Sequence, residues 1–220
     1  MKTLAITLII IFIASSCQKH EKHDILHYFD SYTYENRLEL RNARIFKLLP
    51  KEEGVMEVTV EGLSGSRWFY EDFLEKQDSS KGVYRKVDED FSLCYRFDSV
   101  GVAQYNNFSN GSMFFYPNVT LSAKKAYTIK GKEHLVYVYA ENEGSNGIIS
   151  YYLEEFGFFA YDLNNGSFLI CKRASEYNDK INREALRGVC DSLIRDTCFF
   201  SIYRFNEKNP CLQKILRNIN

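Results

Sequence analysis

The chain has 220 residues, with 28 lysines and arginines against 29 aspartates and glutamates and a formal net charge of −1. No stretch is dominated by one sign of charge, so the electrostatic footprint of a nucleic-acid-binding protein is absent. The chain contains 16 Tyr and 17 Phe but only three Pro. Because Tyr and Phe favour the pleated, half-buried surface of a sheet, this composition favours a β-rich fold.

Residues 1–16 have the three parts of an export signal. Lys2 gives the start a positive charge, residues 4–13 form an apolar run, and residues 14–16 are small. The apolar run is about half of the roughly 20 residues that a helix needs to cross a bilayer, which argues against a permanent transmembrane anchor. We therefore expect residues 1–16 to be a cleaved signal peptide.

Cys17 directly follows the small residues, and two cleavage products fit this pattern. Cleavage at an ordinary small-x-small site would release a plain secreted protein. Small residues before a cysteine also resemble the lipobox of bacterial lipoproteins, which implies that Cys17 becomes the acylated N-terminus. Residues 17–24 then look like the lipidated cysteine and its polar tether, in a style similar to that of Bacteroidetes. Gln18, directly after the cysteine, resembles the residue at that position in lipoproteins sent to the outer membrane. The resemblance therefore implies a lipid anchor in that membrane, on either its periplasmic or its surface face.

Residues 25–220 contain no internal repeat and no linker rich in Pro, Gly or Ser, so we expect one domain. Residues 25–40 show no clear period and are interpreted as an irregular or edge segment. Residues 68–77 are interpreted as one or two helical turns. Elsewhere, apolar and polar residues alternate between turn signals, which predicts strands. In chain order the predicted strands are 56–60, 83–87, 91–97, 113–116, 119–123, 127–130, 133–140, 148–153, 157–161, 167–172 and 198–205, with a short apolar stretch at 44–49 that Pro50 stops.

Two pairs of these strands are predicted to form hairpins. Gly131 and Lys132 separate 127–130 from 133–140. An Asn-Gly pair at 165–166, which suits the positive φ angles of a tight turn, separates 157–161 from 167–172.

The period changes near the C-terminal end. Ile181, Ala185, Val189 and Leu193 recur at every fourth residue, which predicts an amphipathic helix over 178–196. Asn178 or Asp179 could cap it, and a short closing helix is expected over 211–219. The fold class that follows is mainly β: a single curved or closed antiparallel sheet with an amphipathic C-terminal helix packed on one face.

Five cysteines follow Cys17, and export to an oxidising compartment permits disulfides between them. Their odd number leaves at least one thiol free or paired outside the chain. Buried, inert thiols are the alternative interpretation, and the spacings match no zinc site. The disulfide candidates are Cys94, Cys171, Cys190, Cys198 and Cys211.

Three of the four histidines lie in or beside the tether. His20, His23 and His27 would share one face if this segment were helical, and could then hold Zn or Cu. A solvated, flexible segment is the alternative, so these are weak metal candidates and we predict no cofactor. His134 lies beside the predicted turn and is interpreted as exposed. Because nucleophilic catalysis needs a base, most often histidine, beside Ser or Cys, we predict no catalytic residue.

Runs of Tyr and Phe occur at 113–116, 137–139, 151–152 and 156–161. They could form a core, a stacking platform for sugar rings, or the lining of a curved sheet around an apolar ligand. We therefore expect a membrane-anchored envelope lipoprotein that binds a glycan, lipid or protein ligand. A hydrolase with an unrecognised active site and a purely structural envelope protein are the alternatives. The adjacent carboxylates at 88–90 and 154–155 give the hydrolase little support, because neighbours on a strand point to opposite faces.

Overall fold

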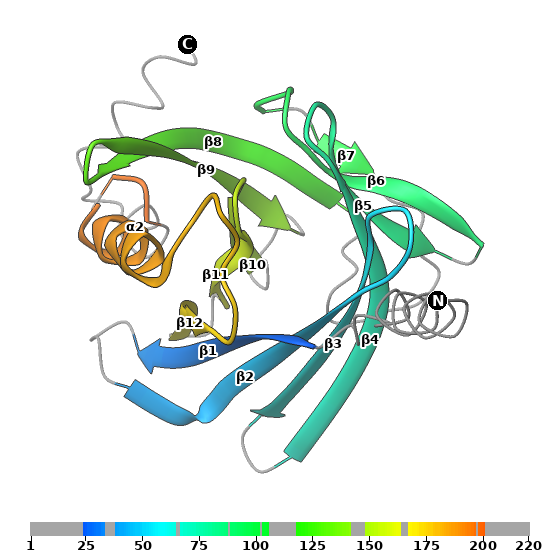
Figure 1. Cartoon of the computed structure of the whole chain (residues 1–220), viewed down its shortest axis with the longest axis horizontal. Helices are drawn as coiled ribbons and strands as arrows, with labels where there is room; N and C mark the ends of the chain where they lie inside the picture. The colour runs from blue at the N-terminus through cyan, green and yellow to red at the C-terminus, as the bar shows by residue number, and fades with distance from the viewer. Residues whose placement is uncertain are drawn as a thin grey trace, which may run out of the picture.

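The computed structural model describes residues 24–33, 38–64, 67–87, 89–101, 103–105, 118–141, 148–163, 167–196 and 198–200. These residues form one mainly β unit, an antiparallel, barrel-like 12-stranded sheet with one helix (Figure 1). The predicted fold class is confirmed.

The elements follow one another in a simple order. They are β1 (Ile25–Thr33), β2 (Leu38–Pro50), β3 (Val55–Ser64), β4 (Arg67–Asp78), β5 (Gly82–Val87), β6 (Asp90–Arg96), β7 (Ala103–Tyr105), β8 (Asn118–Ile129), β9 (Lys132–Glu141), β10 (Ile148–Leu153), β11 (Gly157–Asp162), β12 (Ser167–Ala174) and α2 (Arg183–Arg195).

The sheet is an up-and-down meander. Each strand pairs with the next one along the chain from β1 to β6 and from β7 to β12, and β1 pairs with β12. Within the described strands, the ladder is interrupted only between β6 and β7, at the two ends of the sheet. The segment after β6 bridges part of this gap, because the backbone N–H of Gly101 donates to the carbonyl oxygen of Leu121 at 2.8 Å. The Tyr139 hydroxyl also donates to the carbonyl oxygen of Arg96 at 3.0 Å. The strands therefore curve into a nearly closed ring (Figure 1).

Aromatic side chains fill much of the interior. Phe158 packs edge-on against Tyr95, with ring centroids 4.7 Å apart, and against Tyr152 at 5.0 Å. Phe29 contacts Phe46 at 4.5 Å. The two edge-to-face pairs of Phe158 add to the stability that burial of the rings provides. Many of the aromatic residues noted in the sequence are therefore core residues.

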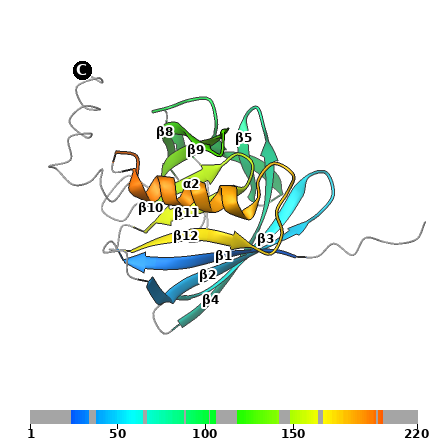
Figure 2. The same cartoon turned by 60° about the vertical axis from the view of Figure 1, so that its left-hand side comes forward.

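The helix α2 lies outside the barrel (Figure 2) and packs against β12 and β8. It buries the apolar face that the four-residue period predicts, including Leu186, Val189 and Leu193. It begins later than predicted, because Asn182 is the N-cap and accepts a hydrogen bond from the backbone N–H of Ala185 at 2.9 Å. The predicted caps are therefore wrong. Among the described residues, no helix combines the length and the apolar character that crossing a membrane requires.

Close packing explains one glycine, and a positive φ angle explains another. A Cβ atom on Gly82 of β5 would lie 1.9 Å from the carbonyl oxygen of Tyr95 on β6, so only glycine permits this approach. At the β8–β9 turn, Lys130 and Gly131 both have positive φ, 51° and 80°. Two such residues form the tight turn that matches the twist of a hairpin, so the predicted hairpin is confirmed, with its turn one residue earlier than predicted.

Several predicted elements differ from the observed ones. Residues 68–77 are not helical but belong to β4, which pairs with β3 from Arg67 to Lys76. Residues 25–40 are not irregular throughout, since they contain β1 and the start of β2. The apolar stretch 44–49 is the second half of β2, and the separate segments 119–123 and 127–130 are one strand, β8. Residues 198–200 form a turn and bend, not a strand. The predictions for 113–116 and 211–219 lie outside the described residues.

Candidate functional site

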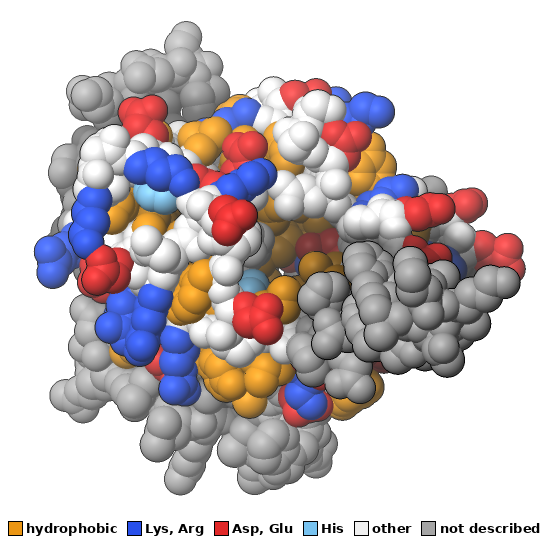
Figure 3. Space-filling view, viewed as in Figure 1, with side chains coloured by type: hydrophobic (Ala, Val, Ile, Leu, Met, Phe, Trp, Pro, Cys, Tyr) orange, Lys and Arg blue, Asp and Glu red, His pale blue; other side chains and the backbone are white. Residues whose placement is uncertain are grey.

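A cavity of about 480 Å³ opens into one end of the barrel, between β1–β5 on one side and β10–β11 on the other. Figure 3 looks toward this end of the barrel and shows hydrophobic side chains set back behind a rim of polar ones. The cavity is within the range of about 300–1,000 Å³ that is usual for small-molecule sites. Its lining residues are Ile25, His27, Phe46, Leu48, Gly54, Met56, Val58, Phe73, Glu75, Lys76, Gln77, Arg85, Tyr152, Phe156, Gly157, Phe158, Tyr161, Glu176, Tyr177 and Asn178.

Strand alternation creates this lining. Successive side chains of a strand point to opposite faces, so every second residue of an inner face reaches the cavity. On β2 these are Phe46 and Leu48, and on β3 they are Met56 and Val58. The wall is therefore apolar over most of its area, and the lining contains no Ser, Thr or Cys among the described residues.

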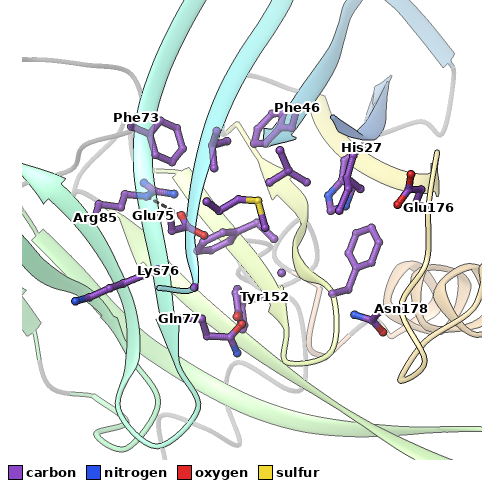
Figure 4. A pocket seen from close by; sticks show the side chains of 18 of the residues that line it. His27, Phe46, Phe73, Glu75, Lys76, Gln77, Arg85, Tyr152, Glu176 and Asn178 are labelled. Atoms are coloured by element: carbon purple, nitrogen blue, oxygen red, sulfur yellow. Dashed lines mark hydrogen bonds and ion pairs between the residues drawn. The ribbon is translucent and has the colours of Figure 1, made fainter. Parts of the chain in front are cut away.

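A buried ion pair interrupts the apolar wall. Arg85 on β5 is 3% exposed, and its Nε lies 3.1 Å from Oε2 of Glu75 on β4 (Figure 4). The guanidinium also lies over the ring of Phe73, 4.6 Å from its centroid. Burial acts to lower the pKa of Arg85, but surrounding groups, Glu75 among them, raise it above its usual value. Burial raises the pKa of Glu75, while Arg85 opposes this shift. The arginine therefore remains a cation next to the cavity.

The ion pair continues into a polar network behind the cavity wall. Nη1 of Arg85 donates to the hydroxyl oxygen of Tyr95 at 3.0 Å. Glu141 on β9 accepts hydrogen bonds from the hydroxyls of Tyr95 and Ser150, and its side chain is buried. Burial raises the pKa of Glu141 to about 7, although these hydrogen bonds and Arg85 lower it in part. A proton on Glu141 leaves the charges of Arg85 and Glu75 balanced inside the barrel.

His27 forms part of the opposite wall, together with Glu176 and Asn178 (Figure 4). Its ring stacks on Phe156, with centroids 4.2 Å apart and planes 10° apart. The residue is 8% exposed, and burial lowers its pKa to about 4. His27 is therefore neutral near pH 7 and contributes a flat, weakly polar surface.

Of the residues predicted to bind a metal or to carry a lipid, His27 alone lies among the described residues. His27 lies on the strand β1 and not on a helix, contrary to the predicted helical face, and Cys17, His20 and His23 lie outside the described residues. The described residues bring no three His, Cys, Asp or Glu side chains into a group that could hold a metal ion.

The disulfide candidates divide into two groups. Cys94, Cys171 and Cys190 are buried free thiols, so they do not form the disulfides that the sequence allows. Sγ of Cys190 points at the carbonyl oxygen of Cys171, 3.4 Å away, and not at its sulfur. Burial raises the pKa of Cys94 to about 11 and that of Cys171 to about 12, which keeps both thiols unreactive. Cys198 is disulfide-bonded, and Cys211 lies outside the described residues.

No sequence pattern predicts that Arg85, Glu75 and Glu141 form a group. A weak signal exists on β5, where Arg85 is two residues after the buried Val83 and therefore shares its inward face. Nothing in the sequence indicates that Arg85 lies near Glu141, which is 56 residues further along the chain. Comparisons with protein-family models, with curated proteins and with solved structures find no match to this chain.

Proposed function

We propose that this protein binds a small, largely apolar molecule in the barrel cavity. The observation that carries this proposal is an apolar cavity of about 480 Å³ with a buried Glu75–Arg85 ion pair in its wall. Apolar pockets with a few fixed polar groups are the usual form of small-molecule sites. A barrel whose only task was structural would be more stable with this space filled, because cavities cost stability.

The lining indicates the kind of ligand. Phe46, Met56 and Phe158 offer contacts to a flat or branched apolar body. Glu75 keeps 19% of its side chain exposed and is held by Arg85, so a hydroxyl or amide of the ligand finds a charge-assisted acceptor there. We infer a ligand with an apolar, preferably aromatic, body and one hydrogen-bond donor.

We further propose that the protein is an exported lipoprotein, anchored in a bacterial outer membrane through a lipid on Cys17. The support is the export signal at 1–16 and its lipobox-like end. The first strand begins at Ile25, which leaves residues 17–24 as a tether between the membrane and the binding domain. In Cys17→Ala, fatty-acid labelling and membrane association should both disappear, and persistence of both would contradict the anchor.

The binding proposal is tested with 2-naphthol, whose own fluorescence reports its environment. Met56→Trp places a larger ring in the cavity and should weaken binding about tenfold or more. Ile45→Trp is the matched control, because Ile45 neighbours Phe46 on β2 and therefore faces the outside of the barrel. The control should bind like the parent protein. Equal binding by Met56→Trp and the parent protein would show that 2-naphthol does not occupy this cavity.

A further inference from the structure

Within the barrel cavity, the charge that a ligand can reach belongs to Glu75. Its side chain is 19% exposed, whereas the side chain of Arg85 is only 4% exposed. Arg85 contacts Oε2 of the carboxylate and is the only side chain among the described residues that bonds to it. Oε1 is therefore left for a ligand, and Figure 4 shows the carboxylate between its dashed ion pair and the other lining residues. A ligand that enters meets a carboxylate and not a guanidinium.

The positive charge of Arg85 is held within the barrel wall. Its guanidinium lies over the rings of Phe73, Tyr95 and Phe158, 4.6, 4.8 and 5.5 Å from their centroids. Nη1 donates to the hydroxyl oxygen of Tyr95 at 3.0 Å, and that hydroxyl donates to the carboxylate of Glu141. Arg85 thus has one carboxylate in direct contact and a second one behind Tyr95.

The lining contains two other charged residues, Lys76 and Glu176. Nζ of Lys76 lies 4.6 Å from the centroid of the Phe91 ring and 5.6 Å from that of Tyr84, and neither ring lines the cavity. The charge of Lys76 therefore points away from the cavity, as Figure 4 shows. Glu176 is exposed on the opposite side (Figure 4). The charges that face an entering ligand are therefore the carboxylates of Glu75 and Glu176.

Aromatic rings share the cavity with the Glu75 carboxylate. Phe46 and Tyr152 line it together with Glu75 (Figure 4). The faces of such rings attract cations, most strongly where water is excluded. A carboxylate also forms its strongest hydrogen bonds with charged donors. This combination favours an alkylammonium group over a neutral donor and disfavours an anion.

The balance of charge behind the wall depends on Glu141. Its strand partners on β8 and β10, Val119 and Ile148, carry no charge. The titratable groups that act on Glu141 or are acted on by it are Arg85 on β5, Cys94 and Tyr95 on β6, and Tyr161 on β11, and of these only Tyr161 is acted on by Arg44 of β2. Because burial raises the pKa of Glu141 to about 7, it ionises as the pH rises through neutrality. The carboxylates of Glu75 and Glu141 then outnumber Arg85, and a cation in the cavity restores the balance.

On the basis of the binding function proposed above, we propose that the ligand of the barrel cavity is a protonated amine with an aromatic or branched apolar body. Its ammonium group donates to Oε1 of Glu75, while Arg85 remains on Oε2. Entry of this cation favours the ionised form of Glu141, so binding releases a proton and strengthens as the pH rises. A carboxylate ligand with the same body meets Glu75 as a like charge.

The test is titration of the purified protein with three ligands that share a naphthalene ring, namely 2-naphthylmethylamine, 2-naphthalenemethanol and 2-naphthoate. Burial of the ring is common to all three, so their affinities differ through the charge of the attached group. At pH 7.5 the amine should bind about tenfold or more tightly than the alcohol, and 2-naphthoate should bind more weakly than the alcohol. Glu75→Gln should reduce the preference for the amine to about twofold or less. The matched control Asp72→Asn, on an exposed residue of the same strand, should keep it.

The dependence on pH tests the part assigned to Glu141. The amine stays protonated up to pH 8, as a lysine side chain does. Between pH 6 and pH 8 its affinity relative to the alcohol should increase about threefold or more. Glu141→Gln should remove this increase, and Glu133→Gln, on an exposed residue of β9, should retain it.

The outcomes separate the amine from the binding function itself. Equal affinities for the amine and the alcohol, tighter binding of 2-naphthoate, or a preference that survives in Glu75→Gln would overturn the amine and leave the binding function in place. Failure of all three ligands to bind would contradict the binding function as well. If Glu75→Gln does not fold, the double variant with Arg85→Met, which removes both charges, should show the same loss of preference. A preference that does not change with pH would overturn the part of Glu141.

Discussion

Replacing Glu141 by Gln should reveal a protonated acid inside the barrel. The pKa of Glu141 is raised by burial from 4.5 to about 7, so the folded protein holds a proton that the unfolded chain releases. The contribution of Glu141 to the free energy of unfolding is fully present below pH 4.5. It declines as the pH rises toward 7, by roughly 3 kcal/mol in total. Gln has the shape of the neutral acid and carries no titrating proton. The unfolding free energy of Glu141→Gln relative to the parent protein should therefore rise by roughly 3 kcal/mol between pH 4.5 and pH 8.

Urea denaturation of both proteins at several pH values measures this difference directly. Any constant offset, caused by the amide protons of Gln, does not depend on pH and does not affect the test. Glu133→Gln, on an exposed residue of the same strand, should give a flat difference. A flat difference for Glu141→Gln as well, or one that grows as the pH falls, would refute the description of Glu141 as a neutral member of the network.

Three further predictions concern the cavity wall. His27→Phe should gain stability relative to the parent protein as the pH falls from 6.5 toward 4, by roughly 3 kcal/mol at most, because the lowered pKa of His27 disfavours the protonated folded state; a pH-independent difference in urea denaturation would contradict this. Arg85→Met leaves Glu75 buried without its cation and should cost about 3–5 kcal/mol. Adding Glu75→Gln should restore part of that stability, and a double variant no more stable than the single one would be inconsistent with the ion pair. Finally, parent protein should bind 2-naphthol more tightly than naphthalene, and equal affinities would exclude a hydrogen bond to Glu75.

The sequence predicts the parts of the fold that depend on local pattern. The hairpin with its turn at Lys130 and Gly131 can be predicted because the turn and the two alternating strands are adjacent in sequence. The strand β4 cannot be predicted from its local sequence, because charged residues such as Glu71 and Asp72 interrupt the alternation of apolar and polar residues. Its pairing with β3 holds it in the extended conformation. Pairing between strands outweighs local propensity here.

The candidate sites depend on segments that lie far apart in sequence. The barrel cavity combines β1–β5 with β10–β11, and only ring closure through the β1–β12 pair brings these strands together. His134 and Glu155, whose side chains are in contact, are separated by a whole strand, and the loop residue Asn178 before α2 donates to the carbonyl oxygen of Glu155. His134 is buried, contrary to the exposed position that the sequence predicts. Periodicity assigns each residue to a face of its own strand but cannot tell which other strand that face meets. The sequence therefore predicts a curved sheet with a helix on one face, but not the residues that line its cavity.

The central claim is that a ligand occupies the barrel cavity, and a crystal structure with 6-bromo-2-naphthol tests it most directly. The anomalous signal of bromine locates the probe without reference to any assumed binding mode. We predict a bromine peak inside the cavity beside Met56 and Phe158, with the naphthol oxygen within hydrogen-bonding distance of Glu75. An empty cavity at saturating probe, or a bromine peak only on the outer surface, would contradict the account.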